Sequence, residues 1–555
     1  MSFTQIKCSV CNKIAEIEFK GKDFSILKCG HTLKQDHLNQ SSPESIRSLD
    51  GKNLYPFQCN GVRFIEDSNA RCLIGDEMGL GKTPQSIAAM FLHSELQPFL
   101  VICKSSLKAQ WQKEIMRWMG EDYFAQILDS PKDIPLTGLP AYILSYDILR
   151  RFAQSARDVK KRNNAIVSEQ IDLITGSSES DLQESEGSKQ KGTLVKLIEK
   201  MRIKTIILDE CQQIKNSESQ RTVFTREICK HVEHVIALSG TPIKNSAAEY
   251  FPILNILKPE LFPRFSSFLQ QYCDSYFNGY AYKTGGLRNP EAFMRKTKDF
   301  ILRRTRDEVL PDLPKIRRSF QFHELGKEVE KAYIETFKQF RDEYNKSDSE
   351  SMSFEESGNI LAFLSKMRHL SGLSKINPTI DHVMEIMGST DDRVCIFVHH
   401  KDVAEILESK LNSLFSELNI PKCSTHKAGD SSLDTERNFE KSRVLICSTL
   451  AGGEGLNLQK LCRRFIMLER QWNPANEEQA EARFPRPEGI KTDFIDGVYM
   501  VAIGTVDEFF SEIVERKREI VGKTLDGKAA EWDQSSLIKE LAETLSLSGG
   551  RRWSI

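Results

Sequence analysis

The sequence has no long apolar run. None of its hydrophobic segments approaches the roughly 18 residues that a membrane-spanning helix needs, so no membrane partner is expected. It also lacks net charge, because 77 Lys and Arg oppose 78 Asp and Glu, and any surface for a polyanion must therefore be a local patch. The 13 cysteines are scattered, with no secretory leader before them. This pattern predicts reduced thiols in a cytosolic or nuclear compartment and argues against a disulfide framework.

The chain also lacks an internal repeat of fixed period, so its organisation is read from short apolar runs. A length of 555 residues allows three or four domains of about 150 residues each. Runs of four or five apolar residues, spaced as buried parallel strands with helix-capable sequence between them, occur in two sets. The runs are 99–103, 141–144, 205–208 and 235–238 in the first set and 394–398, 444–447 and 465–468 in the second. Two sets predict an α/β fold with two lobes.

Changes in composition give the expected domain boundaries. A Ser-rich polar stretch near 174–192 predicts a flexible surface insertion within the first lobe. The region between the lobes is poor in apolar runs and carries long helical patterns, for example over 327–344. The expected units are a small Cys-bearing module (1–45), the first lobe (46–255), a helical protrusion and linker region (256–375), the second lobe (376–525) and a C-terminal tail (526–555).

A glycine-rich loop follows the apolar run 72–74 and opens a helical stretch. Its sequence is Asp76-Glu77-Met78-Gly79-Leu80-Gly81-Lys82-Thr83. A strand, glycine loop, Gly-Lys-Thr and helix in this order are typical of a loop whose N–H groups surround the phosphates of a nucleotide. Lys82 is expected to reach the β- and γ-phosphates, and the Thr83 hydroxyl to bind Mg²⁺. Asp76 stands where the general motif has its first glycine.

Two carboxylates, Asp209 and Glu210, follow the predicted strand 205–208. Because ligands bind at the carboxyl ends of parallel strands, we expect Asp209 to hold Mg²⁺ through water and Glu210 to activate the attacking water. Such pairs also cap helices, which is the alternative. The run Leu238-Ser239-Gly240-Thr241-Pro242 follows another strand. It either links the phosphate site to a bound nucleic-acid strand or is a plain turn.

Arg483 and Arg486 are the candidate cations of the second lobe. Their spacing of three puts both guanidiniums near one face of a helix. Paired arginines suit the charge that develops on a transferred γ-phosphate. A solvated basic face is the alternative.

These segments, in this order, resemble the Swi/Snf-type branch of the superfamily-two helicase-like ATPases over residues 54 to about 525. Further matching segments are 302–305, 448–458 and 472–480. The resemblance implies two RecA-like P-loop lobes with helical protrusions between them and ATP in the cleft. It implies a catalytic set of Lys82, Asp209, Glu210, Arg483 and Arg486. The ATP-binding set that it implies is Gln58 in the adenine-reading position, Asp76, which is usual in this family, Glu77, Met78, Gly79, Leu80, Gly81, Lys82, Thr83 and Gly455.

The same resemblance implies ATP-driven translocation on double-stranded DNA, which remodels DNA or bound protein. The candidate DNA contacts, all beside motif segments, are Lys104, Ser105, Thr241, Arg303, Arg304 and Thr449. The alternatives are a strand-separating DNA or RNA helicase and a non-catalytic nucleic-acid-binding scaffold. The expected location is cytoplasmic and nucleoid-associated in a prokaryote or virus, and nuclear in a eukaryote.

Finer details resemble the distant subgroup that contains the annealing helicases and their bacterial relatives. These details are 272–274, 285–289, 398–401 and Glu469. Three departures from the family pattern are Lys104 in place of a proline, Glu454 in place of a leucine, and prolines around Arg486. Because proline interrupts helix, the reach of Arg486 is less certain than that of Arg483.

The start of the chain carries two close pairs of metal-ligand residues. Cys8 and Cys11, then Cys29 and His31, have the spacing of a tetrahedral Zn²⁺ site, with His37 as an alternative fourth ligand. The alternating stretch 15–19 between them predicts a hairpin strand, as in a zinc ribbon. We expect a structural zinc site that docks to DNA or to a protein partner; unliganded cysteines are the alternative.

Overall fold

The computed structural model describes four N-terminal strands, residues 42–130, 133–149, 195–240, 247–277, 282–346, 354–427, 429–452, 456–471 and 474–509, and Ser511 and Glu515. The chain divides into two compact units. Lobe 1 comprises Met1–Ile243, Glu249–Phe268 and Met294–Thr305, and lobe 2 comprises Lys244–Ala248, Leu269–Phe293 and Arg306–Ile555. The predicted insertion at 174–192 and the tail at 526–555 lie outside the described residues. In the described part of the chain, no helix combines the length and apolar character needed to cross a bilayer.

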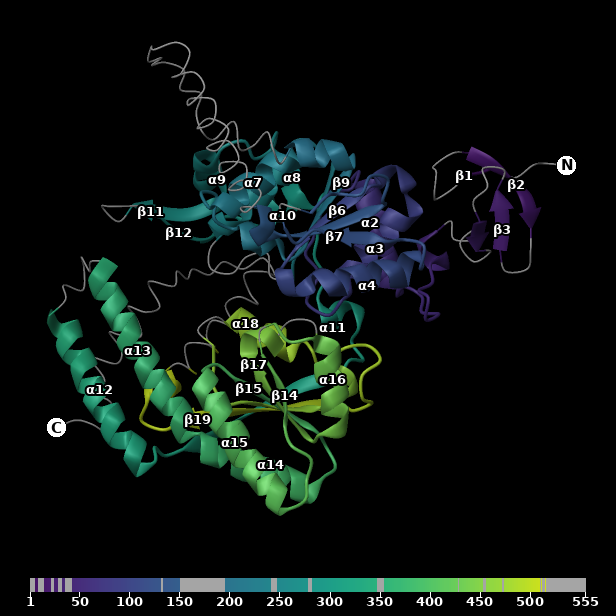
Figure 1. Cartoon of the computed structure of the whole chain (residues 1–555). Coiled ribbons are helices and arrows are strands. Elements are labelled where there is room, and N and C mark those ends of the chain that lie inside the picture. Colours follow the sequence, from purple (N-terminus) through teal and green to yellow (C-terminus); the bar gives the residue numbers. More distant parts are fainter. Residues whose placement is uncertain are drawn as a thin grey trace, which may run out of the picture. The chain divides into compact units, whose positions relative to one another are not determined.

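Lobe 1 is built on a seven-stranded parallel sheet (Figure 1). Its strand order is β13-β5-β10-β9-β6-β8-β7. The strands are β5 (Arg71–Ile74), β6 (Phe99–Cys103), β7 (Ala125–Ile127), β8 (Ala141–Ser145), β9 (Thr205–Leu208), β10 (His234–Leu238) and β13 (Ile301–Leu302). Every residue of β6, β8, β9 and β10 is buried. All four apolar runs predicted for the first lobe are therefore confirmed as strands. Such runs are continuous because a parallel sheet covered on both faces buries every residue of its central strands.

The order of this sheet places the motif segments together. β10 pairs with β5 on one side and with β9 on the other, all three in parallel. Their carboxyl ends therefore lie at one edge of the sheet, where the glycine loop, the carboxylate pair and the segment after Leu238 begin. The helices of lobe 1 are α2 (Pro56–Asp67), α3 (Lys82–Leu92), α4 (Lys108–Met119), α7 (Gln220–Cys229), α8 (Phe251–Leu257), α9 (Phe265–Tyr272, which runs past the lobe boundary) and part of α10 (Pro290–Thr297).

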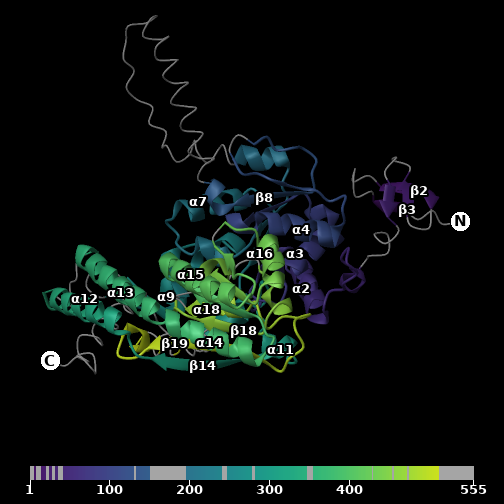
Figure 2. The same ribbon diagram turned by 60° about the horizontal axis from the view of Figure 1, so that its bottom comes forward.

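Lobe 2 repeats the architecture with a six-stranded parallel sheet in the order β14-β19-β18-β15-β17-β16. Figure 2 shows β14 and β19 side by side at one edge of it. The strands are β14 (Lys315–His323), β15 (Val394–Val398), β16 (Ser424–His426), β17 (Val444–Ser448), β18 (Arg464–Met467) and β19 (Phe494–Ala502). The three runs predicted for the second lobe are confirmed as β15, β17 and β18.

Two apolar clusters hold the central strands of lobe 2. One contains Val394, Ile396 and Val398 with residues of the neighbouring helices, and the other contains Cys395 and Phe397 with Phe465 and Phe484. Alternate residues of β15 thus face opposite sides of the sheet, as the period of a strand requires. The helices are α11 (Arg306–Val309), α12 (Lys327–Lys346), α13 (Phe354–Ser374), α14 (Ile376–Ser389), α15 (Lys401–Glu417), α16 (Ser432–Lys441), α17 (Thr449–Gly452) and α18 (Pro474–Glu481).

The region predicted to be helical, 256–375, also contributes strands. The helices α12 and α13 confirm the helical patterns and lie side by side (Figure 1). However, β11 (Cys273–Phe277) and β12 (Tyr282–Leu287) form a hairpin, β13 joins the sheet of lobe 1, and β14 joins the sheet of lobe 2. Two of these strands lack a sequence signal. β13 has only two residues, and β14 is mostly exposed, with charged residues that interrupt any apolar run.

The N-terminal module contains a four-stranded antiparallel sheet in the order β1-β2-β3-β4. Its strands are β1 (Gln5–Lys7), β2 (Ile14–Lys20), β3 (Phe24–Leu27) and β4 (Thr32–Lys34). The hairpin strand predicted at 15–19 is confirmed as part of β2.

Candidate active site

The glycine loop runs from the end of β5 to the first turn of α3. Gly79 has φ 90° and Gly81 has φ 73°, left-handed conformations that favour glycine. A Cβ atom at Gly81 would lie 2.3 Å from Nε2 of Gln58, so this position also has no room for a side chain. The Gln58 amide donates to the carbonyl of Leu80 at 3.1 Å. Gln58 therefore lies against the loop, and its adenine-reading role stays a prediction.

Asp76 starts the loop as a fully buried carboxylate. Arg304 donates to it from Nε (2.9 Å) and Nη2 (2.5 Å). The Gln85 amide donates to Oδ2 of Asp76 at 3.1 Å and accepts from Nη2 of Arg304 at 2.9 Å. Arg304 also donates to the carbonyl of Phe57, and its guanidinium lies 5.4 Å from the centre of the Phe57 ring. The buried charge is thus paired and fully hydrogen-bonded, which is the condition for burying it.

Lys82 folds back onto the loop that contains it. Its ammonium donates to the carbonyls of Asp76 (2.8 Å) and Glu77 (3.3 Å). Burial lowers the pKa of Lys82, and the charges of Glu210, Asp76 and Asp209 oppose this effect. An arriving phosphate would offer the ammonium a stronger, charged acceptor than these neutral carbonyls.

The carboxylate pair lies at the end of β9, within the field of Lys82. Burial, together with the charge of Glu210, raises the pKa of Asp209. Two carboxylates crowded in this way favour a divalent cation, and Mg²⁺ usually takes only one or two protein carboxylates and completes its shell with water and phosphate. No closed cage of three or more ligand residues exists among the described residues. The chemistry of the Asp209 carboxylate fits a divalent cation, and the assignment of Asp209 and Thr83 to Mg²⁺ stays a prediction.

Neighbouring side chains fix the orientation of both carboxylates. The Trp111 indole donates to Oδ2 of Asp209 at 2.8 Å, and the Tyr146 hydroxyl donates to its backbone carbonyl at 2.9 Å. Glu210 has a left-handed backbone (φ 49°, ψ 52°) and accepts a hydrogen bond from Gln212. Such strain in a non-glycine residue persists only where the surroundings impose it, as at active sites.

A second link joins the carboxylates to the neighbouring strand. Ser239, directly after β10, donates to Oε1 of Gln212 at 2.7 Å. Glu210, Gln212 and Ser239 therefore form a chain between two motif segments. The sequence did not identify four residues that support this site: Trp111, Tyr146, Gln85 and Gln212. Gln212 follows the carboxylate pair closely, but the other three occupy ordinary helix or strand-end positions that carry no signal.

The two arginines of lobe 2 follow α18. Burial, together with the charges of Arg483 and Arg306, lowers the pKa of Arg486. Arg486 donates from Nε to the carbonyl of Ala482 at 3.0 Å, so its side chain lies along its own turn. The catalytic role of Arg483 and Arg486 stays a prediction that this arrangement supports.

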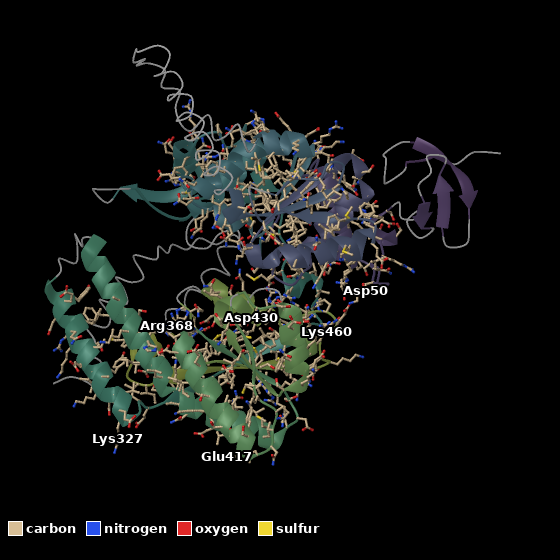
Figure 3. All side chains as sticks on the ribbon, viewed as in Figure 1. Asp50, Lys327, Arg368, Glu417, Asp430 and Lys460 are labelled. Atoms are coloured by element: carbon tan, nitrogen blue, oxygen red, sulfur yellow. The ribbon has the colours of Figure 1, made fainter. Side chains whose placement is uncertain are left out.

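The ends of β15 and β18 carry a buried ionic network in lobe 2. Glu469, 1% exposed, accepts from the backbone N–H groups of His399 (2.8 Å) and His400 (2.9 Å), and its Oε1 lies 2.5 Å from Nδ1 of His400. A Cβ atom at Gly372 on α13 would lie 2.6 Å from the same Oε1, so a larger residue there would displace the Glu469 side chain. Arg368, labelled in Figure 3, reaches the carbonyl of Arg470 from the same helix. Glu469 thus caps the amino end of α15.

Glu469→Gln should loosen this capped turn in a pH-dependent manner. Burial raises the pKa of Glu469, but the hydrogen bond and charge of His400 outweigh it and bring the pKa from 4.5 to about 2. Because its pKa is lowered in the folded state, the ionised Glu469 carboxylate stabilises the fold above pH 4.5. This contribution is lost as the pH falls toward 2. The shift corresponds to on the order of 3 kcal/mol at neutral pH.

Hydrogen exchange at the amides of His399 and His400 would measure this effect. We expect faster exchange in the Glu469→Gln variant at pH 7, with the difference from the unmodified protein shrinking toward pH 3. Glu405→Gln is the control, since Glu405 lies on α15 in an exposed pair with Lys401. Equal exchange in the unmodified protein and the Glu469→Gln variant at pH 7 would contradict the capping role.

The structure changes the interpretation of several predicted DNA contacts. Arg304 donates hydrogen bonds to Asp76, and Arg303 donates to the carbonyls of Gly75 (2.7 Å) and Gly240 (3.3 Å). Thr449 is fully buried and donates to the carbonyl of Val398 at 3.3 Å. Because these donors face the interior of their own lobes, this geometry does not favour the predicted contacts. Lys104 and Ser105 lie directly after β6, half-buried and exposed, and remain candidates.

Some predicted residues lie outside the described part of the chain. They are the nucleic-acid candidate Thr241, the nucleotide candidate Gly455, the predicted zinc ligands Cys8, Cys11, Cys29 and His31, and the alternative ligand His37. Their assignments stay predictions.

Comparison with known proteins identifies the family. Residues 57–372, more than half of the chain, match the SNF2-related domain, and residues 375–488 match the helicase conserved C-terminal domain. A Bos taurus protein named DNA annealing helicase and endonuclease ZRANB3 is 25% identical over 523 residues, which cover 90% of this chain and 44% of that protein. The uncharacterized ATP-dependent helicase MG018 of Mycoplasma genitalium is 26% identical over 504 residues (86% of this chain, 43% of that protein).

One further similar protein and one solved structure complete the comparison. A Caenorhabditis elegans homolog of the SWI/SNF-related matrix-associated actin-dependent regulator of chromatin subfamily A-like protein 1 is 25% identical over 477 residues, 85% of this chain and 62% of that protein. The solved Sulfolobus solfataricus SWI2/SNF2 ATPase core in complex with dsDNA aligns over 93% of this chain and 99% of its own, with 21% identity and a TM-score of 0.37. The chain spans less than half the length of the cattle and Mycoplasma relatives. The chain belongs to the SNF2-related family, and a helicase conserved C-terminal domain follows the SNF2-related domain.

Proposed function

We propose that the chain couples ATP hydrolysis to translocation along double-stranded DNA and thereby remodels DNA or DNA–protein complexes. The observation that carries this proposal is the ordered glycine loop with its paired Asp76, within a chain whose relatives include DNA annealing helicases. The internally supported glycine loop, with Lys82, Asp209 and Glu210 in lobe 1, argues against the non-catalytic scaffold.

Each site residue has a chemical role in this proposal. Lys82 holds the β- and γ-phosphates of ATP, and the loop amides between Gly79 and Thr83 surround them. Thr83 and Asp209 would hold Mg²⁺, which supplies charge neutralisation on the phosphates when bound. Glu210, held in place by Gln212, orients the attacking water and accepts its proton.

The proposed DNA contact on lobe 1 is the segment after β6. Lys104 begins a short turn there and Ser105 is exposed. Contacts of this type bind phosphate, fix position on the duplex and carry no sequence information. We propose no DNA role for Arg304.

Lys104→Ala should weaken duplex binding by the same factor on every sequence. One lost phosphate contact lowers the slope of log affinity against log salt by about 0.9 on B-form DNA. Fluorescence anisotropy on two unrelated duplexes, at several salt concentrations, measures both quantities. The control is Lys230→Ala, because Lys230 lies in the same lobe but just before β10, at the other edge of the sheet. An unchanged slope in the Lys104→Ala variant would remove this contact from the proposal.

The substrate class is tested by ATPase stimulation and by displacement assays. We expect duplex DNA to stimulate hydrolysis more than single-stranded DNA or RNA does, and we expect displacement of a third strand from a triplex. Robust unwinding of a tailed duplex, or activation by RNA alone, would favour the strand-separating helicase instead. We also propose that residues 1–45 form a zinc-ribbon-like module whose partner is DNA or a protein.

A further inference from the structure

The feature that carries a further inference is the anchor of the glycine loop. Asp76 is a fully buried carboxylate, and its cationic partner, Arg304, comes from 228 residues further along the chain. A guanidinium that meets both carboxylate oxygens in parallel fixes orientation as well as distance. The direction of the Asp76 side chain is therefore set by Arg304.

The backbone on both sides of Asp76 is fixed to the same segment. The N–H of Gly75 donates to the carbonyl of Leu302 at 2.7 Å, and the N–H of Glu77 donates to the carbonyl of Arg304 at 2.9 Å. These bonds continue the parallel pairing of β13 with β5. Gly75 and the first two loop residues, Asp76 and Glu77, are thus held by side-chain and backbone bonds to 302–304.

Arg304 also reaches the other end of the loop through Gln85. The Gln85 amide, which accepts from Arg304, donates to the carbonyls of Leu80 (3.3 Å) and Gly81 (3.2 Å). The same carbonyl of Leu80 accepts from Gln58. One guanidinium therefore braces both ends of the turn that must surround the phosphates.

This brace acts on the phosphate-binding cation. The ammonium of Lys82 is positioned by the carbonyls of Asp76 and Glu77, and these are the residues that Arg304 holds. Loss of Arg304 would leave the Asp76 carboxylate buried without its cation, and the loop would have to open to hydrate it. Lys82 and the loop amides would then lose the arrangement that phosphate requires.

We infer that Arg304 is a positioning residue for ATP, which acts through Asp76 and Gln85 to hold the glycine loop in its phosphate-binding shape. It touches no nucleotide in this role. The inference rests on the ATPase activity of the family and is independent of the proposed DNA track.

The test is nucleotide affinity measured without DNA. Arg304→Ala should weaken binding of a fluorescent ATP analogue by about tenfold or more, as couplings of 0.5–3 kcal/mol within one network correspond to about 2- to 150-fold. Arg304→Lys keeps the charge but not the paired geometry. Its nucleotide affinity should lie between that of the unmodified protein and that of Arg304→Ala. In the double variant Asp76→Asn with Arg304→Gln no charge is left unpaired, so we expect affinity above that of Arg304→Ala.

The control is Arg117→Ala. Arg117 makes a paired contact with Asp50 in the same lobe (3.1 and 2.9 Å), away from the glycine loop. The Arg117→Ala substitution should lower the melting temperature and leave nucleotide affinity unchanged. If Arg304→Ala also lowers only the melting temperature, with affinity within twofold, Arg304 is merely structural. If that variant does not fold, an unchanged affinity in both Arg304→Lys and the double variant would overturn the inference equally.

Discussion

Lys82→Ala is expected to reduce ATP hydrolysis by at least about 10²–10³-fold, the loss typical of removing one preorganised electrostatic partner from a reacting group. The ammonium sits over the carbonyls of Asp76 and Glu77 and is the cation of the glycine loop itself. A phosphate-release assay with and without duplex DNA measures the effect. Lys52→Ala is the control, because Lys52 pairs with Asp50 at 3.6 Å elsewhere in lobe 1.

Glu210→Gln separates binding from chemistry in the same site. The amide of glutamine keeps an oxygen for the hydrogen bond from Gln212, so the loop should keep its shape and ATP should still bind. Turnover should fall by about 10²–10⁴-fold, because the variant cannot accept the proton of water. Near-normal turnover in either variant would remove the assigned roles of Lys82 and Glu210.

The second large effect is expected at Arg483. An arginine that neutralises the transferred phosphoryl group contributes about 10³–10⁵-fold to the rate, so Arg483→Ala should lower kcat by this order with little change in ATP affinity. Arg486→Ala should cost less, since Arg486 is held against its own turn by the carbonyl of Ala482.

Steady-state kinetics on both variants separate the two arginines. Arg437→Ala is the control, because Arg437 is an exposed arginine of the same lobe, 3.8 Å from Asp434. A higher KM with unchanged kcat in Arg483→Ala would mean that the arginine binds substrate and does not act in the chemical step.

The sequence predicted the sheets well because both are parallel and their central strands are buried. Strands such as β6 and β15 must then be apolar at every position, which gives an unmistakable run. The edge strands β13 and β14 carry no such signal. β14 contains Arg317 and Arg318, whose partners Asp496 and Glu481 lie more than 160 residues away. Long-range pairs of this kind cannot be predicted from local spacing.

The same limit applies to two arginines that the sequence assigned to DNA. Arg303 and Arg304 follow an apolar run beside family motifs, and an arginine there is usually expected to face a ligand. The signal that pointed elsewhere was Asp76, a carboxylate where the general motif has glycine. The structure buries Asp76 completely, and a buried carboxylate needs a cation. The sequence indicates that a partner exists but does not identify which arginine it is.

The strand β13 leads into one of the tethers between the two lobes, the last one along the chain, which passes from lobe 1 to lobe 2 after Thr305. A motor that pulls on this tether loads a two-residue edge strand whose last bonds are those between 302–304 and the glycine loop. Mechanical tension on this tether would thus act directly on the residues that begin the glycine loop. Such a connection would let an opposing load slow the ATP cycle, and a single-molecule measurement of ATPase rate against applied force would reveal it.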